Sequence, residues 1–234
     1  MCFGKTWSAI SLTIMLISTA VCIYYKGSYL ILAMLIFLAS KELIQLLLYS
    51  TGLAKCKTKW NKWLTSLSWV HICFQPFFVN LFFSAFSPNA VLYKIPIILS
   101  FIYALFNLPV LREIGGKSKH RCQPDYNSNM CRAQTCSING KYHLGYGFDL
   151  KSADNGGFTP SGFTYNLLSF APAYIIGDWF LATLHLIVAA LSYKFINNVG
   201  EASAVWCLNS FWIGLIGMYT VVHKQHQGLK LSFT

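Results

Sequence analysis

Residues 166–195, with the sequence NLLSFAPAYIIGDWFLATLHLIVAALSYKF, form an apolar stretch long enough to cross a lipid bilayer, which takes about 20 helical residues. The stretch nevertheless contains Asp178 and His185 in its interior. A charged group at the bilayer centre costs about 2.5–3.5 kcal/mol on insertion scales. On one continuous helix these two residues, seven positions apart, would face the same side. The stretch therefore predicts a membrane helix that turns polar residues toward the inside of a bundle.

Charged residues are scarce throughout the chain. They make up 11% of the 234 residues, against about 25% in a typical soluble domain, and apolar residues make up 55%. This composition excludes an ordinary water-soluble domain and predicts a single membrane domain over residues 1–234, an all-α polytopic helical bundle. The apolar runs predict about six transmembrane helices, at residues 7–25, 28–49, 63–86, 92–111, 166–193 and 203–222. Alternatively, the first run is a cleaved signal peptide, because Lys5 precedes its apolar part.

Basic residues are distributed unevenly among the predicted loops. The side that holds both termini and the loops 51–62 and 112–165 carries 14 Lys or Arg residues, the other side carries three, and Lys41 lies within a span. Cytosolic loops are enriched in Lys and Arg, so we expect both termini and the long loop 112–165 to be cytosolic. The net charge of +11 then belongs to membrane-flanking loops, and the expected partners are membrane lipids rather than nucleic acid.

Polar residues interrupt the predicted spans. Glu42 and Asp178 are two of the seven acidic residues of the chain, and an acidic residue within a span is expected to face the bundle interior and find a partner there. The positions of the polar residues along their spans predict a cavity open to the cytosol. The candidate catalytic residues are Glu42, Ser68, His71 and Asp178, and the expected lining residues are Gln45, Gln75 and Asn209.

Two mechanisms suit these residue types. In the first, His71, His185 and His223 hold a catalytic zinc ion, and the protein is a metal-dependent enzyme that acts on a lipid-like substrate. In the second, Glu42, Asp178 and His71 bind and release protons or a cation in a small transporter or channel. A third possibility is a non-catalytic membrane interaction protein, in which these residues only lock the bundle through hydrogen bonds.

The cysteines pose a separate question. Cys122, Cys131 and Cys136 lie in the long loop, where they are expected to be thiols if the loop is cytosolic, and they are candidates for a structural zinc site. With the opposite orientation, two of these cysteines would form a disulfide. Cys2, next to the initiating methionine, is a candidate for modification by palmitoylation.

Short motifs give the chain a resemblance to other sequences. The alternating segment 141–150 predicts a short hairpin and contains His143-Leu144-x-Tyr146-x-Phe148. Together with the start Met1-Cys2-Phe3, Trp7-Ser8 and the acidic Glu42, this segment resembles a group of uncharacterised small polytopic membrane proteins of bacteria and large DNA viruses. These proteins begin Met-Cys-Phe or Met-Cys-Trp followed by Ser, and this chain departs from them at Gly4. The resemblance implies a helical membrane fold and no established activity.

Overall fold

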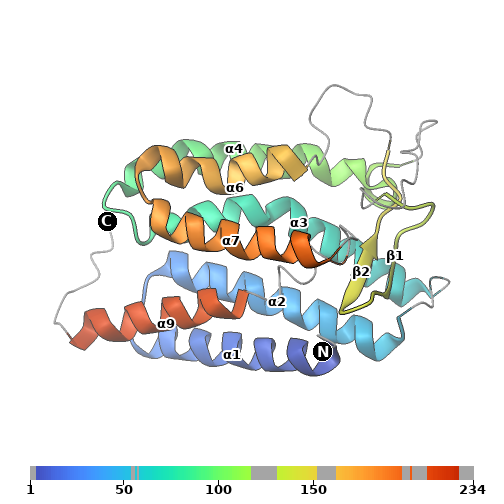
Figure 1. Ribbon diagram of the computed structural model, residues 1–234, viewed down its shortest axis with the longest axis horizontal. Helices are drawn as coiled ribbons and strands as arrows, with labels where there is room; N and C mark the ends of the chain where they lie inside the picture. Colours follow the sequence, from blue (N-terminus) through green and yellow to red (C-terminus); the bar gives the residue numbers. More distant parts are fainter. Residues whose placement is uncertain are drawn as a thin grey trace.

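Long helices lying side by side along one axis make up the computed structural model (Figure 1). It describes residues 4–53, 56, 58–116, 131–151, 162–196, 201 and 210–226. The long helices are α1 (Lys5–Tyr24), α2 (Tyr29–Thr51), α3 (Lys59–Ser84), α4 (Lys94–Asn107), α6 (Gly162–Ile176), α7 (Trp179–Phe195) and α9 (Ser210–His226).

Within the described residues, four segments are long and apolar enough to cross a membrane. They are Lys5–Tyr24, Tyr29–Thr51, Lys59–Ser84 and Ala90–Val110, the last made of the 3-10 turn η1 (Ala90–Tyr93), α4 and the 3-10 turn η2 (Leu108–Val110). Large apolar side chains lie on the outside of the bundle, among them Ile95 (69% exposed) and Ile175 (84% exposed). A protein in water would bury many of these side chains, whereas lipid solvates them. The prediction of several helices long and apolar enough to span a membrane is therefore confirmed for these four segments.

The stretch that was predicted to be one span at 166–193 is instead a pair of helices. Helix α6 ends at Ile176, and Gly177 has a left-handed backbone with φ +100°. The amide groups of Gly177 and Asp178 both donate to the carbonyl oxygen of Ala173, at 3.1 and 2.8 Å. Helix α7 begins directly after Asp178 and packs on α6. A left-handed glycine commonly ends a helix. Asp178 and His185 therefore do not lie on one continuous helix, and the expectation that they face the same side no longer holds.

The described ends of the chain lie at opposite ends of the bundle (Figure 1). Helices α1 and α9 run parallel, because Gly214 meets Met15 in the middle of α1, and Val221 meets Gly27, just after α1 ends. A Cβ atom at Gly214 would lie 2.7 Å from Met15 Cε, so a larger residue here would require the Met15 side chain to shift. The six-span arrangement that placed both termini on one side does not match this bundle, because the helical pair α6–α7 adds one more reversal of the chain.

A small antiparallel hairpin covers the end of the bundle where α1 begins (Figure 1). Strand β1 (Cys136–Asn139) pairs with β2 (Leu144–Gly147), with Cys136 opposite Gly147 and Asn139 opposite Leu144. The hairpin was expected within 141–150, and its first strand lies before that segment. Leu144, Tyr146 and Phe148 are buried in the cluster formed with Trp69 of α3. The hairpin is therefore part of the protein core, although its loop is polar in composition.

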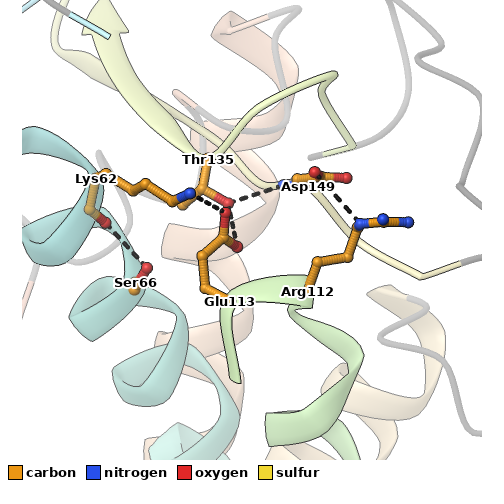
Figure 2. Close-up of polar contacts among 6 residues, drawn as sticks. All are labelled: Lys62, Ser66, Arg112, Glu113, Thr135 and Asp149. Atoms are coloured by element: carbon orange, nitrogen blue, oxygen red, sulfur yellow. Dashed lines mark hydrogen bonds and ion pairs between the residues drawn. The ribbon is translucent and has the colours of Figure 1, made fainter. Parts of the chain in front are cut away.

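Polar contacts attach the hairpin segment to α3 and to the short helix α5 (Arg112–Gly115), as Figure 2 shows. Lys62 of α3 forms an ion pair with Glu113 at 3.0 Å, and Thr135 donates a hydrogen bond to Glu113 at 2.7 Å. The Asp149 amide in turn donates to the Thr135 hydroxyl at 3.0 Å, and Arg112 lies 3.5 Å from the Asp149 carboxylate. The two ends of the hairpin segment are therefore held by one chain of contacts.

A disulfide between Cys56 and Cys136 joins the α2–α3 connection to β1, with the two Cα atoms 5.2 Å apart. Cys131 is disulfide-bonded as well. The predicted structural zinc site of Cys122, Cys131 and Cys136 is thus wrong, because a metal ligand must be a thiolate and a disulfide sulfur is not. Cys122 itself lies outside the described residues.

We expect the Cys56–Cys136 disulfide to contribute about 2–4 kcal/mol to stability, because it closes a loop of 80 residues in the unfolded chain. Cys56→Ser and Cys136→Ser should each lower the midpoint of thermal unfolding in detergent by the same amount. The double variant should be no less stable than either single variant, because both remove the same bond. Additive losses in the double variant would show that the two cysteines stabilise the protein separately.

Candidate functional site

Polar side chains from α1, α2 and the hairpin meet in one cluster, at the place where the hairpin lies against the two helices. We call it the polar cluster, and its members are Ser8, Lys41, Glu42, Gln45, Tyr49, His143 and Tyr146. The four members from α2 lie within about 100° of each other around the helix, since each residue turns by about 100°. This single face of α2 points away from lipid and toward α1 and the hairpin.

Gln45 is the centre of the polar cluster. Its side-chain oxygen accepts hydrogen bonds from the Ser8 hydroxyl at 3.3 Å and from His143 Nε2 at 3.0 Å. Its amide nitrogen donates to the Tyr146 hydroxyl at 3.1 Å. Gln45 is fully buried, and these contacts join α1, α2 and β2 through a single side chain.

The tautomer of His143 follows from its two partners. The Gln45 oxygen only accepts, so His143 Nε2 carries a proton. In the neutral ring Nδ1 is then an acceptor, and it lies 2.6 Å from the Tyr49 hydroxyl. The same Tyr49 oxygen accepts a bond from the Leu144 amide at 3.0 Å. Tyr49 is only partly buried, so it forms the outer end of this hydrogen-bonded chain.

Lys41 and Glu42 bring opposite charges into the same buried space, with exposed fractions of 1% and 0%. The Lys41 ammonium lies 4.2 Å from the centre of the Tyr146 ring, which is a cation–π geometry. Ser8 lies beside the Glu42 carboxyl group, but its proton is directed to Gln45. Within the described residues neither carboxyl oxygen of Glu42 has a hydrogen-bond partner. A buried carboxylate in this state is costly unless it is protonated or paired.

The Glu201 side chain holds the loop between β1 and β2 in place. Its carboxylate accepts hydrogen bonds from the backbone amides of Lys141 at 3.1 Å, of Tyr142, and of His143 at 2.7 Å. Charge-assisted bonds of this kind are roughly twice as strong as neutral ones. Glu201 is 3% exposed, so it sets the position from which the His143 ring reaches Gln45.

The four predicted catalytic residues are dispersed. Only Glu42 belongs to the polar cluster, where it is joined by the predicted lining residue Gln45. Ser68 donates to the carbonyl oxygen of Leu64 in its own helix at 3.2 Å. His71 Nε2 lies 2.9 Å from the Ser40 hydroxyl, and the Asp178 carboxylate accepts a bond from Tyr93 at 3.1 Å. Among the described residues, no hydrogen bond or ion pair joins any two of the four candidates.

The predicted zinc ligands are also separated. His185 packs against the rings of Phe83 and Phe170, and His223 is exposed and stacked on Tyr219. In the part of the chain that the structure describes, no group of three or more His, Cys, Asp or Glu side chains has a metal-binding arrangement. The end of α6 before Gly177 and Asp178 explains why His185 does not lie where the sequence predicted. His185 belongs to the separate helix α7 and not to one span that continues from α6. Gln75 is buried on α3, and Asn209 and Cys2 lie outside the described residues.

Sequence reasoning missed most of the polar cluster. Lys41, Gln45 and Tyr49 share one helix face with Glu42, and this spacing was a usable signal. No signal in the sequence showed that His143 and Tyr146 would fold back onto α2, because nearly 100 positions separate them from it. The segments that carried the resemblance to other sequences, around Ser8, Glu42 and His143, nevertheless meet at this one place.

The model of a family of unknown function (DUF5765) matches residues 7–227. No curated protein and no solved structure matches the chain.

We expect Glu201→Gln to destabilise the hairpin loop by about 1–3 kcal/mol, because an amide side chain cannot accept all the bonds that the carboxylate accepts. Thermal unfolding in detergent should detect the loss, and hydrogen exchange of the amides of residues 141–143 should become faster. The control is Lys62→Gln, which breaks an ion pair whose lysine is 53% exposed and should change stability by at most about 1 kcal/mol. Equal effects of the two substitutions would contradict this role of Glu201.

Proposed function

We propose that this chain, which belongs to the family of unknown function DUF5765, is a small proton-coupled membrane transporter that binds and releases a proton at Glu42. The observation that supports the proposal is the burial of Glu42 within α2, with no hydrogen-bond partner for either carboxyl oxygen among the described residues. Ionisable residues within membrane spans are rare and commonly belong to ion or proton pathways. The family match adds the fold family and no activity.

The neighbours of Glu42 give its carboxyl group two stable states. In the protonated state, the carboxyl group donates to the Ser8 oxygen, whose own proton is directed to Gln45. In the ionised state, the Lys41 ammonium leaves the Tyr146 ring and pairs with the carboxylate. In both states the Glu42 carboxyl group has a partner, and the two states differ by one proton and by the position of the Lys41 side chain. Such a two-state element is what a proton-coupled protein needs.

The hydrogen-bonded chain above Glu42 supplies the route by which protons approach. Tyr49 lies at its partly exposed end, and His143 follows at 2.6 Å. His143 is the residue type that gains and loses protons most readily near neutral pH. Gln45 orients His143 and Ser8 but cannot itself carry a proton. In this proposal a water molecule therefore bridges the last step, from His143 to Glu42. The enzyme hypothesis has less support, because its candidate residues do not meet.

The disulfides support an orientation for the bundle. Disulfides form and persist in oxidising compartments and are rare in the cytosol. Cys136 begins β1, Cys56 is bonded to it, and Cys131 pairs with Phe148 directly after β2, so all three lie at the hairpin end. We therefore place the hairpin and the start of α1 outside the cytosol, and the end of α9 in the cytosol. This proposed orientation differs from the one expected from the basic loops, and in it protons would enter the polar cluster from outside.

In liposomes with an internal pH-sensitive dye, an imposed pH gradient should drive a proton flux that depends on the wild-type protein. Glu42→Gln should reduce the flux to the level of protein-free vesicles, because the amide cannot take up the proton. Two controls should retain the flux: Asp178→Asn at the far end of the bundle, and Glu113→Gln on its surface. Infrared spectra of the wild type should contain a protonated carboxyl band that Glu42→Gln lacks. An unchanged flux in the Glu42 variant would overturn the proposal.

The orientation can be measured in intact cells of the expression host. After mild reduction, a membrane-impermeant maleimide should label Cys56 and Cys136 without lysis, because both would be outside the cytosol. Cys56→Ser combined with Cys136→Ser should reduce that labelling, and the remainder should come from Cys131, which is disulfide-bonded at the same end. Labelling only after lysis would place the hairpin end in the cytosol instead.

A further inference from the structure

We propose that α3 carries a binding site for a phospholipid with an anionic headgroup, running from the start of the helix to its middle. The inference does not depend on the proton-binding role of Glu42. It rests on two surface grooves that share part of their lining, one polar and one apolar.

The polar groove lies at the hairpin end of α3. It has a volume of about 390 Å³ and is lined by Lys59, Lys62, Trp63 and Ser66, with Glu113 on its far side. Glu113 is already engaged by Lys62 and by Thr135 (Figure 2). The three charged groups of this groove sum to one positive charge, which suits a monoanionic phosphate.

The start of α3 adds to this attraction. Lys59 and Lys62 lie in the first turns of the helix, where the backbone amides present a partial positive charge, and no acidic residue occurs in the first turn. The positive charges of Lys59 and Lys62 lie near the positive end of the helix dipole, which is unfavourable. A bound anion would reduce this repulsion. Trp60 and Trp63 are 64% and 53% exposed, which is typical of aromatic residues at the level of lipid headgroups.

The apolar groove continues from the polar one toward the middle of the bundle. It lies between α2 and α3 and has a volume of about 420 Å³. Both grooves are lined by Leu67 and Val70, so they adjoin at these two residues, and we call the two grooves together the depression. Beyond these two residues the lining consists mainly of rings, among them Phe37, Phe74 and Phe78. The depression is charged at the membrane surface and apolar at depth, as a phospholipid is.

The depth of each part assigns the parts of the lipid. From Lys62 to His71 the helix rises by about 14 Å, at 1.5 Å per residue, so His71 meets an acyl chain and not the ester groups. The Ser40 hydroxyl donates to the Phe37 carbonyl at 2.7 Å and lies 2.9 Å from His71 Nε2. The hydrogen bond between Ser40 and His71 gives both polar side chains a partner next to the acyl chain.

The test uses the purified protein in native mass spectrometry, with equal amounts of phosphatidylglycerol and phosphatidylcholine competing for binding. Wild-type protein should prefer phosphatidylglycerol, and Lys59→Gln should reduce the preference about fivefold, the effect of one lysine near an anionic lipid surface. Lys94→Gln, an exposed lysine at the other end of the bundle, should leave the preference unchanged. No preference in the wild type, or the same preference in Lys59→Gln, would overturn the headgroup assignment.

A second pair of variants tests the acyl chain. Val70→Trp fills the depression where its two parts join, so tightly retained lipid should be lost regardless of headgroup. Ile98→Trp places the same side chain on the lipid-facing surface of α4, where Ile98 is 57% exposed, and should retain the lipid. Equal retention by both variants would overturn the site, and thermal unfolding of each variant confirms that it is folded.

Discussion

In lipid, a polar group that finds no partner within the protein has none at all, and this constraint shapes the interior of the bundle. The side-chain nitrogen of Asn80 on α3 shows how a buried polar group finds partners within the protein. It donates to the carbonyl oxygens of Pro76 at 2.8 Å and Leu168 at 2.9 Å, and lies 3.2 Å from the Ser100 hydroxyl. One amide thereby connects α3 to α6 and α4. The Trp69 indole, which donates to the backbone of Asn107 at 3.1 Å, attaches α3 to the end of α4 in the same way.

Most of the polar cluster follows the same rule, and Glu42 departs from it. Gln45, Tyr49 and His143 use their donors and acceptors on one another, and this network holds the hairpin on the bundle. Glu42 is the member whose oxygens lack hydrogen bonds within the described residues. Natural proteins keep such a group where a second state satisfies it. The exception to the rule is therefore the most informative residue of the cluster.

Much of the helical architecture was predictable because lipid requires long apolar runs. Helices α1 to α3 lie within a few residues of their predicted bounds. The error at Gly177 arose because unbroken hydrophobicity outweighed a helix-ending glycine. The site was only partly predictable: burial of Glu42 and Gln45 followed from their type and position. Contacts to His143 and Glu201 join distant parts of the chain, and neither spacing nor composition reveals such contacts.

The Cys56–Cys136 disulfide has a mechanical consequence for the hairpin. It attaches β1 covalently to the connection before α3, whereas β2 is held on α2 by hydrogen bonds through Tyr146 and His143. One edge of the hairpin is thus held by a covalent bond and the other by non-covalent contacts. A rotation about β1 would withdraw His143 and Tyr146 from Gln45 together, while the anchored edge stays in place. The covalent bond therefore keeps β1 next to the start of α3 even where the non-covalent contacts of β2 are broken.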